Sequence, residues 1–322
     1  MKAIVQDAYG SPDVLNLREI DTPEVGDDEA LVRVHAAGVD RGVWHLMTGL
    51  PYLGRLAFGL LAPKTPVPGM DVAGVVETVG KGVTRFQPGD EVFGVGKGTF
   101  AEYARAPENK LAHKPASLTF EQAAVVAISG LTALQGLRDH GKVRPGQKVL
   151  IIGASGGVGT FAVQIAKAFG GRVTGVCGAA KVEMVRSIGA YHVIDYTRED
   201  FAEGDPRYDL ILDIGGSSSL SRLRRALTLR GTLVIVGGEG GGRWLGIVGR
   251  LLRAHLLFPF VGQKLGTFIS KENHEDLILL KDLIEAGTLT PVIDRTYPLA
   301  EVPEAIRYLE GGHAQGKVVI TV

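Results

Sequence analysis

The sequence predicts an α/β protein in which a β-rich domain is interrupted by a second domain built on a doubly wound parallel sheet. Three observations point to this fold class: short β-rich runs up to about residue 115, alternating strand and helix patterns from about residue 118, and a final strand of the first type. A chain of 322 residues is long enough for about two domains. We expect the β-rich domain at 1–122 and 266–322, and the parallel-sheet domain at 123–265.

The first part of the chain contains short runs rich in β-branched and apolar residues. Examples are ALVRVHAAGV, VAGVVETVG, DEVFGV and FAEYARA, and turns of Gly, Pro and Asp separate them at close spacing. Closely spaced short strands of this kind are typical of an all-β barrel or sandwich. The closing run GKVVITV has the same character, so we expect the chain to return to this domain.

The middle of the chain follows a different period. The stretch TFEQAAVVAISGLTALQGLRDHG has a helical pattern, and the strand-like runs KVLII, RVTGVC, HVIDY, DLILDI and TLVIVG come after it, each next to a helical pattern. Strands that alternate with helices form a parallel sheet covered on both faces. Two further helices, NHEDLILLKDLIEAG and VPEAIRYLEGG, are expected before the final strand.

Composition narrows the class of function. Lys and Arg number 35, as do Asp and Glu, so no net charge draws the chain to nucleic acid or to an anionic membrane. We expect small molecules and other copies of the chain as partners. Cys177 is the only cysteine, which excludes an internal disulfide and favours a reducing, cytoplasmic setting. The chain has no apolar signal segment and no uninterrupted apolar run of roughly 18 residues, which predicts a soluble protein.

A glycine-rich turn, GASGGVG, follows the strand KVLII and opens an amphipathic helix. The dinucleotide fingerprint G-x-G-x-x-G falls on Ala154, Gly156 and Gly159, with Ala in the first position. The start of such a helix exposes backbone N–H groups on which a pyrophosphate can bind. A structural turn is the alternative, but the position between strand and helix favours dinucleotide binding. The predicted contacts are Ala154, Ser155, Gly156, Gly157, Val158 and Gly159.

The second strand of this domain indicates which dinucleotide is bound. Sites that prefer NAD place an acidic residue about 20 residues after the fingerprint, where it holds the ribose hydroxyls. Here that place is GVCGAAK, with Cys177 and Gly178 and no carboxylate. Gly178 leaves room for a phosphate, and Lys181 and Tyr196 are candidates to bind it, with Arg198 in reserve. We therefore expect NADPH rather than NADH. The alternatives are that Lys181 is only a solvated lysine at a helix start and that Tyr196 only fills space at the end of a strand.

Several motifs together resemble the medium-chain dehydrogenase/reductase superfamily, and within it the zinc-independent NADPH:quinone oxidoreductase-like branch. They are GMDVAGVVETVGKGVTRFQPGDEVFG, LTALQGL, GASGGVG followed by AVQIAKAFG, and the closing GKVVI, so the resemblance covers essentially the whole length. It implies a GroES-like catalytic domain, an inserted Rossmann domain that binds NADP, and an active-site cleft between them. It also implies a homodimer that pairs through the sheet edge of the Rossmann domain.

The positions that hold catalytic zinc in zinc alcohol dehydrogenases of this superfamily are Asp40, Met70 and Ile128 in this chain. One carboxylate, a thioether and an alkyl group cannot supply a tetrahedral zinc site, and a structural zinc lobe needs four cysteines. We expect no metal. Without a Lewis acid the acceptor has to be electrophilic by itself, which predicts reduction of a quinone or another conjugated carbonyl. Reduction of an enone or alkenal double bond is the close alternative, and a non-catalytic NADPH-binding protein is the alternative of another class.

The resemblance also implies which residues lie beside the nicotinamide and the acceptor. The catalytic candidates are Asp40, Trp44 and Thr132, where Trp44 offers a flat face for stacking and Thr132 a hydroxyl. The family often has Asn at the position of Asp40, and Trp44 is equally well explained as a core residue. The segment GLPYLGRLAFGLLAPKTP at 49–66 either lines a pocket for a flat acceptor or is simply buried. Further cofactor contacts are implied at Ser129, Thr132, Gly237 and Gly238.

Overall fold

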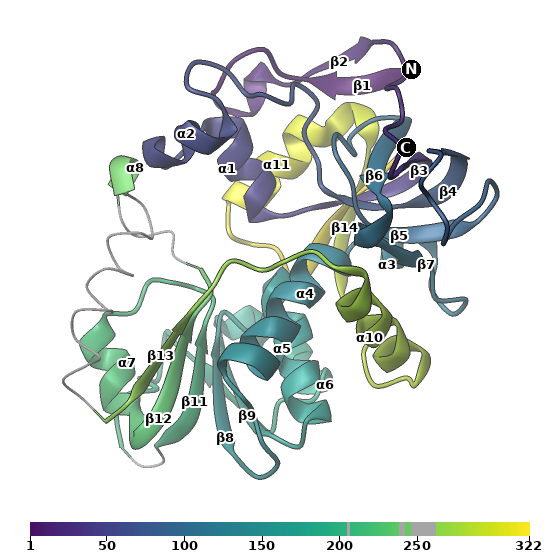
Figure 1. Ribbon diagram of the computed structural model, residues 1–322. Helices are drawn as coiled ribbons and strands as arrows, with labels where there is room; N and C mark the ends of the chain where they lie inside the picture. The colour runs from purple at the N-terminus through teal and green to yellow at the C-terminus, as the bar shows by residue number, and fades with distance from the viewer. Residues whose placement is uncertain (205–206, 238–241, 246–261) are drawn as a thin grey trace. The chain divides into compact units, whose positions relative to one another are not determined.

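The computed structural model describes residues 1–204, 207–237, 242–245 and 262–322 (Figure 1). Its contacts divide the chain into two compact units. Met1–Leu131 together with Lys271–Val322 form the first, called the β-rich unit below, and Thr132–Ser270 form the second, called the parallel-sheet unit. Gly238, one of the predicted cofactor contacts, lies outside the described residues. The assignment of catalysis to one unit and of nucleotide binding to the other stays a prediction.

The main sheet of the β-rich unit has the strand order β14-β15-β3-β4-β5-β7, and β6 also pairs with β3. The C-terminal strand β15 is antiparallel to β3, with Val318 opposite Val39, and β14 is parallel to β15. The chain therefore returns to the sheet that its first part begins. The strands of this unit are β1 (Lys2–Val5), β2 (Asn16–Glu19), β3 (Glu29–Val39), β4 (Asp71–Val79), β5 (Glu91–Val95), β6 (Tyr103–Pro107), β7 (Leu111–His113), β14 (Ile293–Pro298) and β15 (Lys317–Thr321).

Strand β3 lies at the centre of this unit. β4, β6 and β15 all pair with it, so its backbone hydrogen bonds are made within the sheet. Most of its residues are buried, and its sequence is largely apolar. Val32, Phe100 and Ile320 belong to one buried cluster with residues of α1 and α11. The helices of this unit are η1 (Pro12–Val14), α1 (Arg41–Thr48), η2 (Tyr52–Gly54), α2 (Arg55–Phe58), η3 (Glu108–Lys110), α3 (Phe120–Ala123), α10 (His274–Glu285), η7 (Leu299–Glu301) and α11 (Val302–Glu310).

The helical pattern predicted from Thr119 onward is broken into three helices. They are α3, α4 (Ala127–Gln135) and the short π-helix η4 (Gly136–His140). The break lies where the chain packs directly against β3, since a Cβ at Gly38 would be only 2.6 Å from the carbonyl oxygen of Ala124. The spacing of apolar residues along this stretch does not reveal contact with a distant strand. The helical pattern therefore gave no sign of the break.

Among its described residues, the parallel-sheet unit contains six strands in the order β10-β9-β8-β11-β12-β13, and every neighbouring pair is parallel. The chain starts in the middle at β8, adds two strands on one side and then three on the other, so the order reverses between β8 and β11. In doubly wound sheets, ligands bind at the carboxyl ends of the strands at this reversal. The strands are β8 (Lys148–Ile152), β9 (Arg172–Cys177), β10 (His192–Asp195), β11 (Tyr208–Asp213), β12 (Leu227–Ile235) and β13 (Lys264–Thr267).

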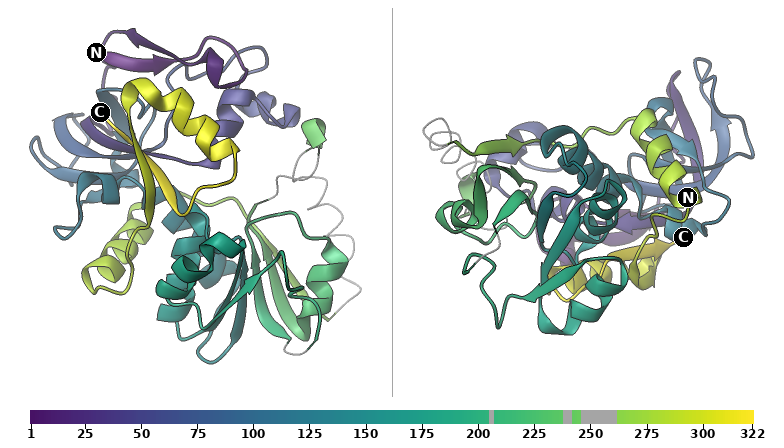
Figure 2. Two further views of the ribbon diagram at one scale, coloured as in Figure 1. Left: turned by 180° about the vertical axis from the view of Figure 1, so that it is seen from behind. Right: turned by 90° about the horizontal axis from the view of Figure 1, so that it is seen from below.

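Helices cover this sheet on both faces (Figure 2). Right-handed crossovers place α5 and α6, which follow β8 and β9, on one face and α7, which follows β11, on the other. The predicted α/β fold class, a β-rich domain interrupted by a second domain with a doubly wound parallel sheet, is confirmed. Within the described part of the chain, no helix is both long enough and apolar enough to cross a membrane. The remaining helices of this unit are α5 (Gly157–Ala168), η5 (Ala179–Lys181), α6 (Val182–Ser187), α7 (Leu220–Ala226) and α8 (Gly242–Leu245).

Candidate functional site

The glycine-rich turn connects the carboxyl end of β8 to the start of α5. Gly153 adopts a φ of 86°, in the region that glycine favours, and its carbonyl accepts a hydrogen bond from the Gly156 amide at 3.2 Å. Gly156 is the N-cap of α5 and, having no side chain, leaves the first N–H groups of the helix without a side-chain acceptor. An anion bound at this point would find these donors available.

Gly156 and Gly159 have different surroundings. A Cβ at Gly156 would meet only the Gly153 carbonyl oxygen, at 3.6 Å, so the space beside this glycine is open. A Cβ at Gly159 would clash with the same oxygen and would lie 2.7 Å from the carbonyl carbon of Ala154. Because Gly159 has no side chain, α5 can pack closely on the turn. Because Gly156 has none, the space at the start of α5 stays open. Both features fit a bound pyrophosphate.

The carboxyl ends of β9 and β10 bring together two of the three residues predicted to recognise a phosphate. A Cβ at Gly178 would lie 3.6 Å from the hydroxyl oxygen of Tyr196, and the amide of Tyr196 donates to the Cys177 carbonyl at 3.1 Å. Tyr196 is 63% exposed. Lys181 follows one turn later, and its amide donates to the Gly178 carbonyl at 2.9 Å. β9 does not end in an Asp or a Glu. The space at Gly178 therefore lacks the carboxylate that would hold the ribose hydroxyls of NAD.

Asp195, at the end of β10, comes directly before Tyr196 in the sequence. Its Oδ1 accepts hydrogen bonds from the amide and the hydroxyl of Thr197, at 3.0 and 2.8 Å. These bonds hold the pKa of Asp195 below its usual range. Arg198, the reserve candidate, lies 3.7 Å from the same carboxylate. The carboxylate of Asp195 is therefore occupied by its own turn.

The end of β12 supplies another glycine. A Cβ at Gly237 would clash with the carbonyl oxygen of Ile214, and the Gly237 amide donates to the Asp213 carbonyl at 3.3 Å. Asp213 itself is fully buried at the end of β11, and its side chain accepts from the Gly216 amide at 3.1 Å. Asp213 was not predicted, because one acid at the end of an apolar run carries no spacing signal.

Helix α4 carries Ser129 and Thr132. The two residues are three positions apart, so they share a face of the helix. Ser129 is buried, and the hydroxyl of Thr132 donates to the hydroxyl oxygen of Ser270 at 3.1 Å. Ser270 was missed by the sequence analysis because it is 138 residues away along the chain.

In the β-rich unit, Asp40 caps helix α1. Its Oδ1 accepts from the amides of Gly42 at 2.7 Å and Val43 at 3.3 Å, which is the usual role of an N-cap carboxylate. Its Oδ2 is buried and has no hydrogen-bond partner among the described residues. Asp40 thus has a structural role that the sequence analysis did not consider. Its second carboxylate oxygen, Oδ2, takes no part in the cap.

Asp71 and Lys317 form a buried ion pair close to Asp40. Lys317 Nζ lies 3.0 Å from Asp71 Oδ2, and the two side chains are 2% and 0% exposed. The other oxygen of Asp71 accepts from the Ile128 amide at 2.8 Å. The pKa of Asp71 is raised to about 6, mainly because the carboxyl group is buried. The positive charge of Lys317 lowers this pKa, and the negative charge of Asp40 raises it. The pair lies in the motifs GMDVAG and GKVVI, but sequence spacing gave no reason to connect them.

The positions matched to zinc ligands lie in this neighbourhood. A Cβ at Gly42 would be 2.8 Å from Met70 Cε as well as from Asp40 Oδ1, and Ile128 is bonded to Asp71 through its amide. The space around Asp40 is therefore bordered by a thioether and an ion-paired acid. Among the residues that the structure describes, no group of three or more His, Cys, Asp or Glu side chains is arranged to hold a metal ion.

Trp44 is half-buried on α1 and packs against the core of the β-rich unit. Its indole N–H donates to Glu310 Oε1 at 2.5 Å, and the guanidinium of Arg41 lies 6.0 Å from the ring centroid. These contacts support the reading of Trp44 as a packing residue. Its stacking on an acceptor stays a prediction.

The segment 49–66 is not buried. Arg55 fixes its start, donating to the Gly49 carbonyl at 3.0 Å and lying over the rings of Tyr9 and Tyr52. The apolar side chains beyond it are exposed, and Leu61 reaches 92%. The alternative of simple burial is wrong for Leu53, Leu56, Phe58, Leu60 and Leu61.

Two protein families match the chain. The alcohol dehydrogenase GroES-like domain matches residues 26–116, and the zinc-binding dehydrogenase family matches residues 188–320. A mitochondrial NAD(P)H oxidoreductase of Mus musculus is 37% identical over 100% of this chain and 89% of the relative. The quinone oxidoreductase of Homo sapiens is 32% identical over 99% of this chain and 97% of its own.

A chloroplastic NADPH-dependent alkenal/one oxidoreductase of Arabidopsis thaliana is 33% identical over 99% of this chain and 79% of the relative. Among solved structures, the quinone oxidoreductase of Escherichia coli complexed with NADPH superposes with a TM-score of 0.84, at 26% identity and over 100% of both chains. The chain therefore belongs to the quinone-oxidoreductase-like branch of the medium-chain dehydrogenase/reductase superfamily and is a pyridine-nucleotide oxidoreductase.

Proposed function

We propose that this chain uses NADPH to reduce a quinone or another conjugated carbonyl, and that it does so without zinc. The chemistry at the positions matched to zinc ligands carries the proposal. Asp40 uses one oxygen to cap α1, and Met70 and Ile128 offer a thioether and an alkyl group. Zinc in proteins is held by thiolate, imidazole or carboxylate ligands in a tetrahedral arrangement, and this set does not provide one.

The lack of such ligands restricts the acceptor. A simple ketone needs a Lewis acid to polarise it, and a simple alcohol needs one to ionise. A quinone or an enone accepts a hydride into its conjugated system, so one hydrogen-bond donor is enough to stabilise the oxyanion that forms. We therefore expect electron-poor acceptors to react and simple secondary alcohols not to react.

The residues of the parallel-sheet unit fit a bound NADPH, because the start of α5 has no side-chain cap and the space beside Gly156 is open. Bound NADPH supplies the hydride. We assign its pyrophosphate to the turn, its 2′-phosphate to Gly178, Lys181 and Tyr196, and its nicotinamide end to Ser129, Thr132, Gly237 and Gly238. The pyrophosphate contacts are Ala154, Ser155, Gly156, Gly157, Val158 and Gly159.

On the acceptor side we assign Asp40, Trp44 and Thr132. We assign the hydroxyl of Thr132 to orient the nicotinamide or the acceptor, since its hydrogen bond to Ser270 holds the side chain in one orientation. The exposed apolar side chains of 49–66 suit contact with a flat, apolar ring.

Reduction of an enone or alkenal double bond is the second candidate, and the name of the Arabidopsis thaliana relative supports it. It shares every residue assignment above and differs only in the acceptor. A non-catalytic NADPH-binding role is the candidate of a different class. It predicts tight NADPH binding without turnover of any acceptor.

Steady-state oxidation of NADPH tests the proposal. The acceptors are 1,4-benzoquinone, 9,10-phenanthrenequinone, a short enone and, in the reverse direction with NADP⁺, isopropanol, each with and without a chelator. We expect turnover of a quinone or the enone, no oxidation of isopropanol, and no effect of the chelator. Robust alcohol oxidation, or stoichiometric zinc in protein purified without added metal, would contradict the zinc-independent mechanism.

The remaining expectations about the setting also stand as proposals. They are a cytoplasmic location, a homodimer, and no nucleic acid or membrane partner. The mouse relative is named as mitochondrial and the Arabidopsis thaliana relative as chloroplastic, so the location needs its own measurement, for example by fractionation of the cells that make the protein.

A further inference from the structure

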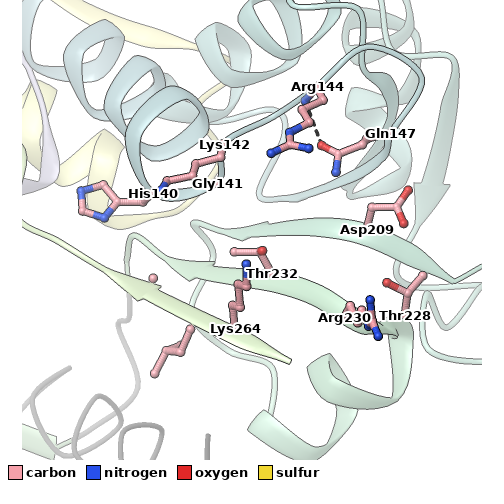
Figure 3. A pocket seen from close by; sticks show the side chains of 12 residues that line it. His140, Gly141, Lys142, Arg144, Gln147, Asp209, Thr228, Arg230, Thr232 and Lys264 are labelled. Carbon is pink, nitrogen blue, oxygen red and sulfur yellow. Dashed lines mark hydrogen bonds between the residues drawn. The ribbon is translucent and has the colours of Figure 1, made fainter. Parts of the chain in front are cut away.

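A cavity of about 480 Å³ lies in the parallel-sheet unit, at the amino ends of its strands (Figure 3). Lys264, the first residue of β13, and Asp209, near the start of β11, line it, and the loop 141–147 before β8 forms another wall. The glycine-rich turn follows the opposite, carboxyl end of β8. A strand of five residues is about 16 Å long, so this cavity is separate from the turn proposed to bind NADPH.

The lining of this cavity is strongly cationic. Lys142, Arg144, Arg230 and Lys264 contribute four positive charges, and Asp209 contributes the one carboxylate. Oδ2 of that carboxylate already accepts a hydrogen bond from the Lys148 amide at 2.9 Å. Within the described ranges, none of the four cationic side chains forms a hydrogen bond or an ion pair. In a chain whose charges balance overall, this is a local excess that an anion would neutralise.

The walls of the cavity are fixed by close packing. A Cβ at Gly266 would lie 3.3 Å from His140 Cβ, and the His140 ring stacks on Phe268 with 4.3 Å between the ring centroids. A Cβ at Gly141 would lie 2.9 Å from the carbonyl oxygen of Gly136. The loop that carries two of the cations is thus held firmly against the sheet. A site whose walls are already ordered loses little freedom when a ligand binds.

Lys142 has an unusual backbone conformation. Its φ is 49°, and it is the one residue other than glycine with a positive φ in the described ranges. A lysine is disfavoured in this left-handed region, where glycine or asparagine would be accepted more easily. An observed outlier of this kind suggests that the side chain has a use that offsets the strain. Here the side chain adds a positive charge to the cavity.

We propose that this cavity binds a small anion that carries several phosphoryl groups. A cavity of about 480 Å³ lined by four cations has room and positive charge for more than one phosphoryl group, and Lys and Arg both suit phosphoryl oxygens. Gln147, Thr228 and Thr232 also line the cavity and offer uncharged donors. Inorganic tripolyphosphate and a nucleoside triphosphate share this chemistry. The site does not depend on the function proposed above.

Calorimetric titration of the NADPH-saturated protein with tripolyphosphate and with ATP at low ionic strength tests the site. We expect one equivalent to bind, and added salt to weaken the binding, because the contacts are ionic. The variant R144Q/K264Q should bind at least tenfold more weakly. The control R186Q/K81Q removes two positive charges outside the cavity and should bind as the wild type does. Tighter binding of ATP than of tripolyphosphate identifies a nucleotide as the source of the phosphates, and equal binding identifies inorganic oligophosphate.

K142G separates the charge from the fold. Glycine accepts a φ of 49°, so the melting temperature should be unchanged or higher, while the anion should bind at least fivefold more weakly. The proposal is overturned if neither anion binds the wild type at millimolar concentration, or if R144Q/K264Q binds like the control. It is also overturned if that variant changes only the oligomeric state, since the cavity would then be part of a contact between copies.

Discussion

Lys181 offers the most direct test of which dinucleotide this oxidoreductase prefers. We expect K181A to weaken NADPH binding at least tenfold and to leave NADH binding unchanged, because a lost charge-assisted contact costs about 1.5–3 kcal/mol. Fluorescence titration with both cofactors measures the ratio. The control is R186A on the next helix, α6, where the arginine pairs with Glu183 and is exposed. An unchanged ratio in K181A would show that the phosphate is bound elsewhere.

Asp71 should leave a signature in the pH dependence of stability. Its pKa is about 6 in the folded state against an ordinary 3.8, so the folded chain binds more protons than the unfolded chain between these values. The stabilising contribution of this group is therefore complete below about pH 4 and is lost as the pH rises through about 6. We expect the free energy of unfolding of D71N to lack this decrease with rising pH. Urea unfolding of both proteins at pH 4, 5 and 6 measures it, and parallel curves would contradict the assignment.

Residues of the site differ in how far the sequence revealed them. The glycine-rich turn and Gly178 were found because a strand, a turn and a helix leave a local pattern. Asp71, Asp213 and Ser270 were missed, since each makes its key contact with residues that no short spacing connects. For Asp40, the resemblance suggested a catalytic position, and the sequence analysis did not consider the helix cap that the structure shows.

Helix α5 and the turn before it give a matched pair of glycine variants. G159A forces a Cβ against the Gly153 carbonyl, so we expect a lower melting temperature together with loss of NADPH binding. G156A meets open space and has a φ of −86°, so the fold should keep its melting temperature while NADPH affinity falls. Thermal unfolding and cofactor titration of both variants separate the two effects. Normal NADPH binding by G156A would remove the turn from the proposed site.

Strands β4 and β15 are joined by the buried pair of Asp71 and Lys317. Removing one partner leaves a buried charge, so K317M should lower the free energy of unfolding by about 3–5 kcal/mol. K97M breaks the more exposed pair of Lys97 with Glu29 and should change it by about 0–1 kcal/mol. Denaturant unfolding measures both. A similar small effect in the two variants would mean that the buried pair contributes little to holding β15.

Strands in the middle of the parallel sheet were predictable, and the edge strand β13 was not. β8 and β11 are almost entirely buried, which requires the continuous apolar runs that the sequence displays. β13 has the sequence KLGT, pairs on one side only and has no fully buried residue, so nothing in its pattern marks it as a strand. Helix α4 shows the opposite error. The helical pattern of the sequence continues through the break between α3 and α4, which lies where the chain packs against β3.

The assembly of two copies is expected to use this edge strand. Ile269, just beyond β13, is 91% exposed and offers an apolar contact at this edge of the sheet. We expect light scattering to give twice the chain mass of 34.1 kDa for the wild type, and I269D to shift it toward the monomer. L17D, which places the same charge on an exposed leucine of β2, is the control. A monomeric wild type would remove the prediction.

The return of β15 to β3 also sets an order of events during synthesis. Residues 132–270 form one continuous stretch, so the parallel-sheet unit has its whole sequence outside the ribosome before β14 and β15 are made. The β-rich unit, by contrast, needs strands separated by more than 270 positions, and β3 has to wait for its partner β15. Domains tend to fold as units as the nascent chain emerges. The unit made in the middle is therefore able to fold first, while the earlier strands β3 to β7 remain an incomplete sheet and a natural place for chaperones to bind.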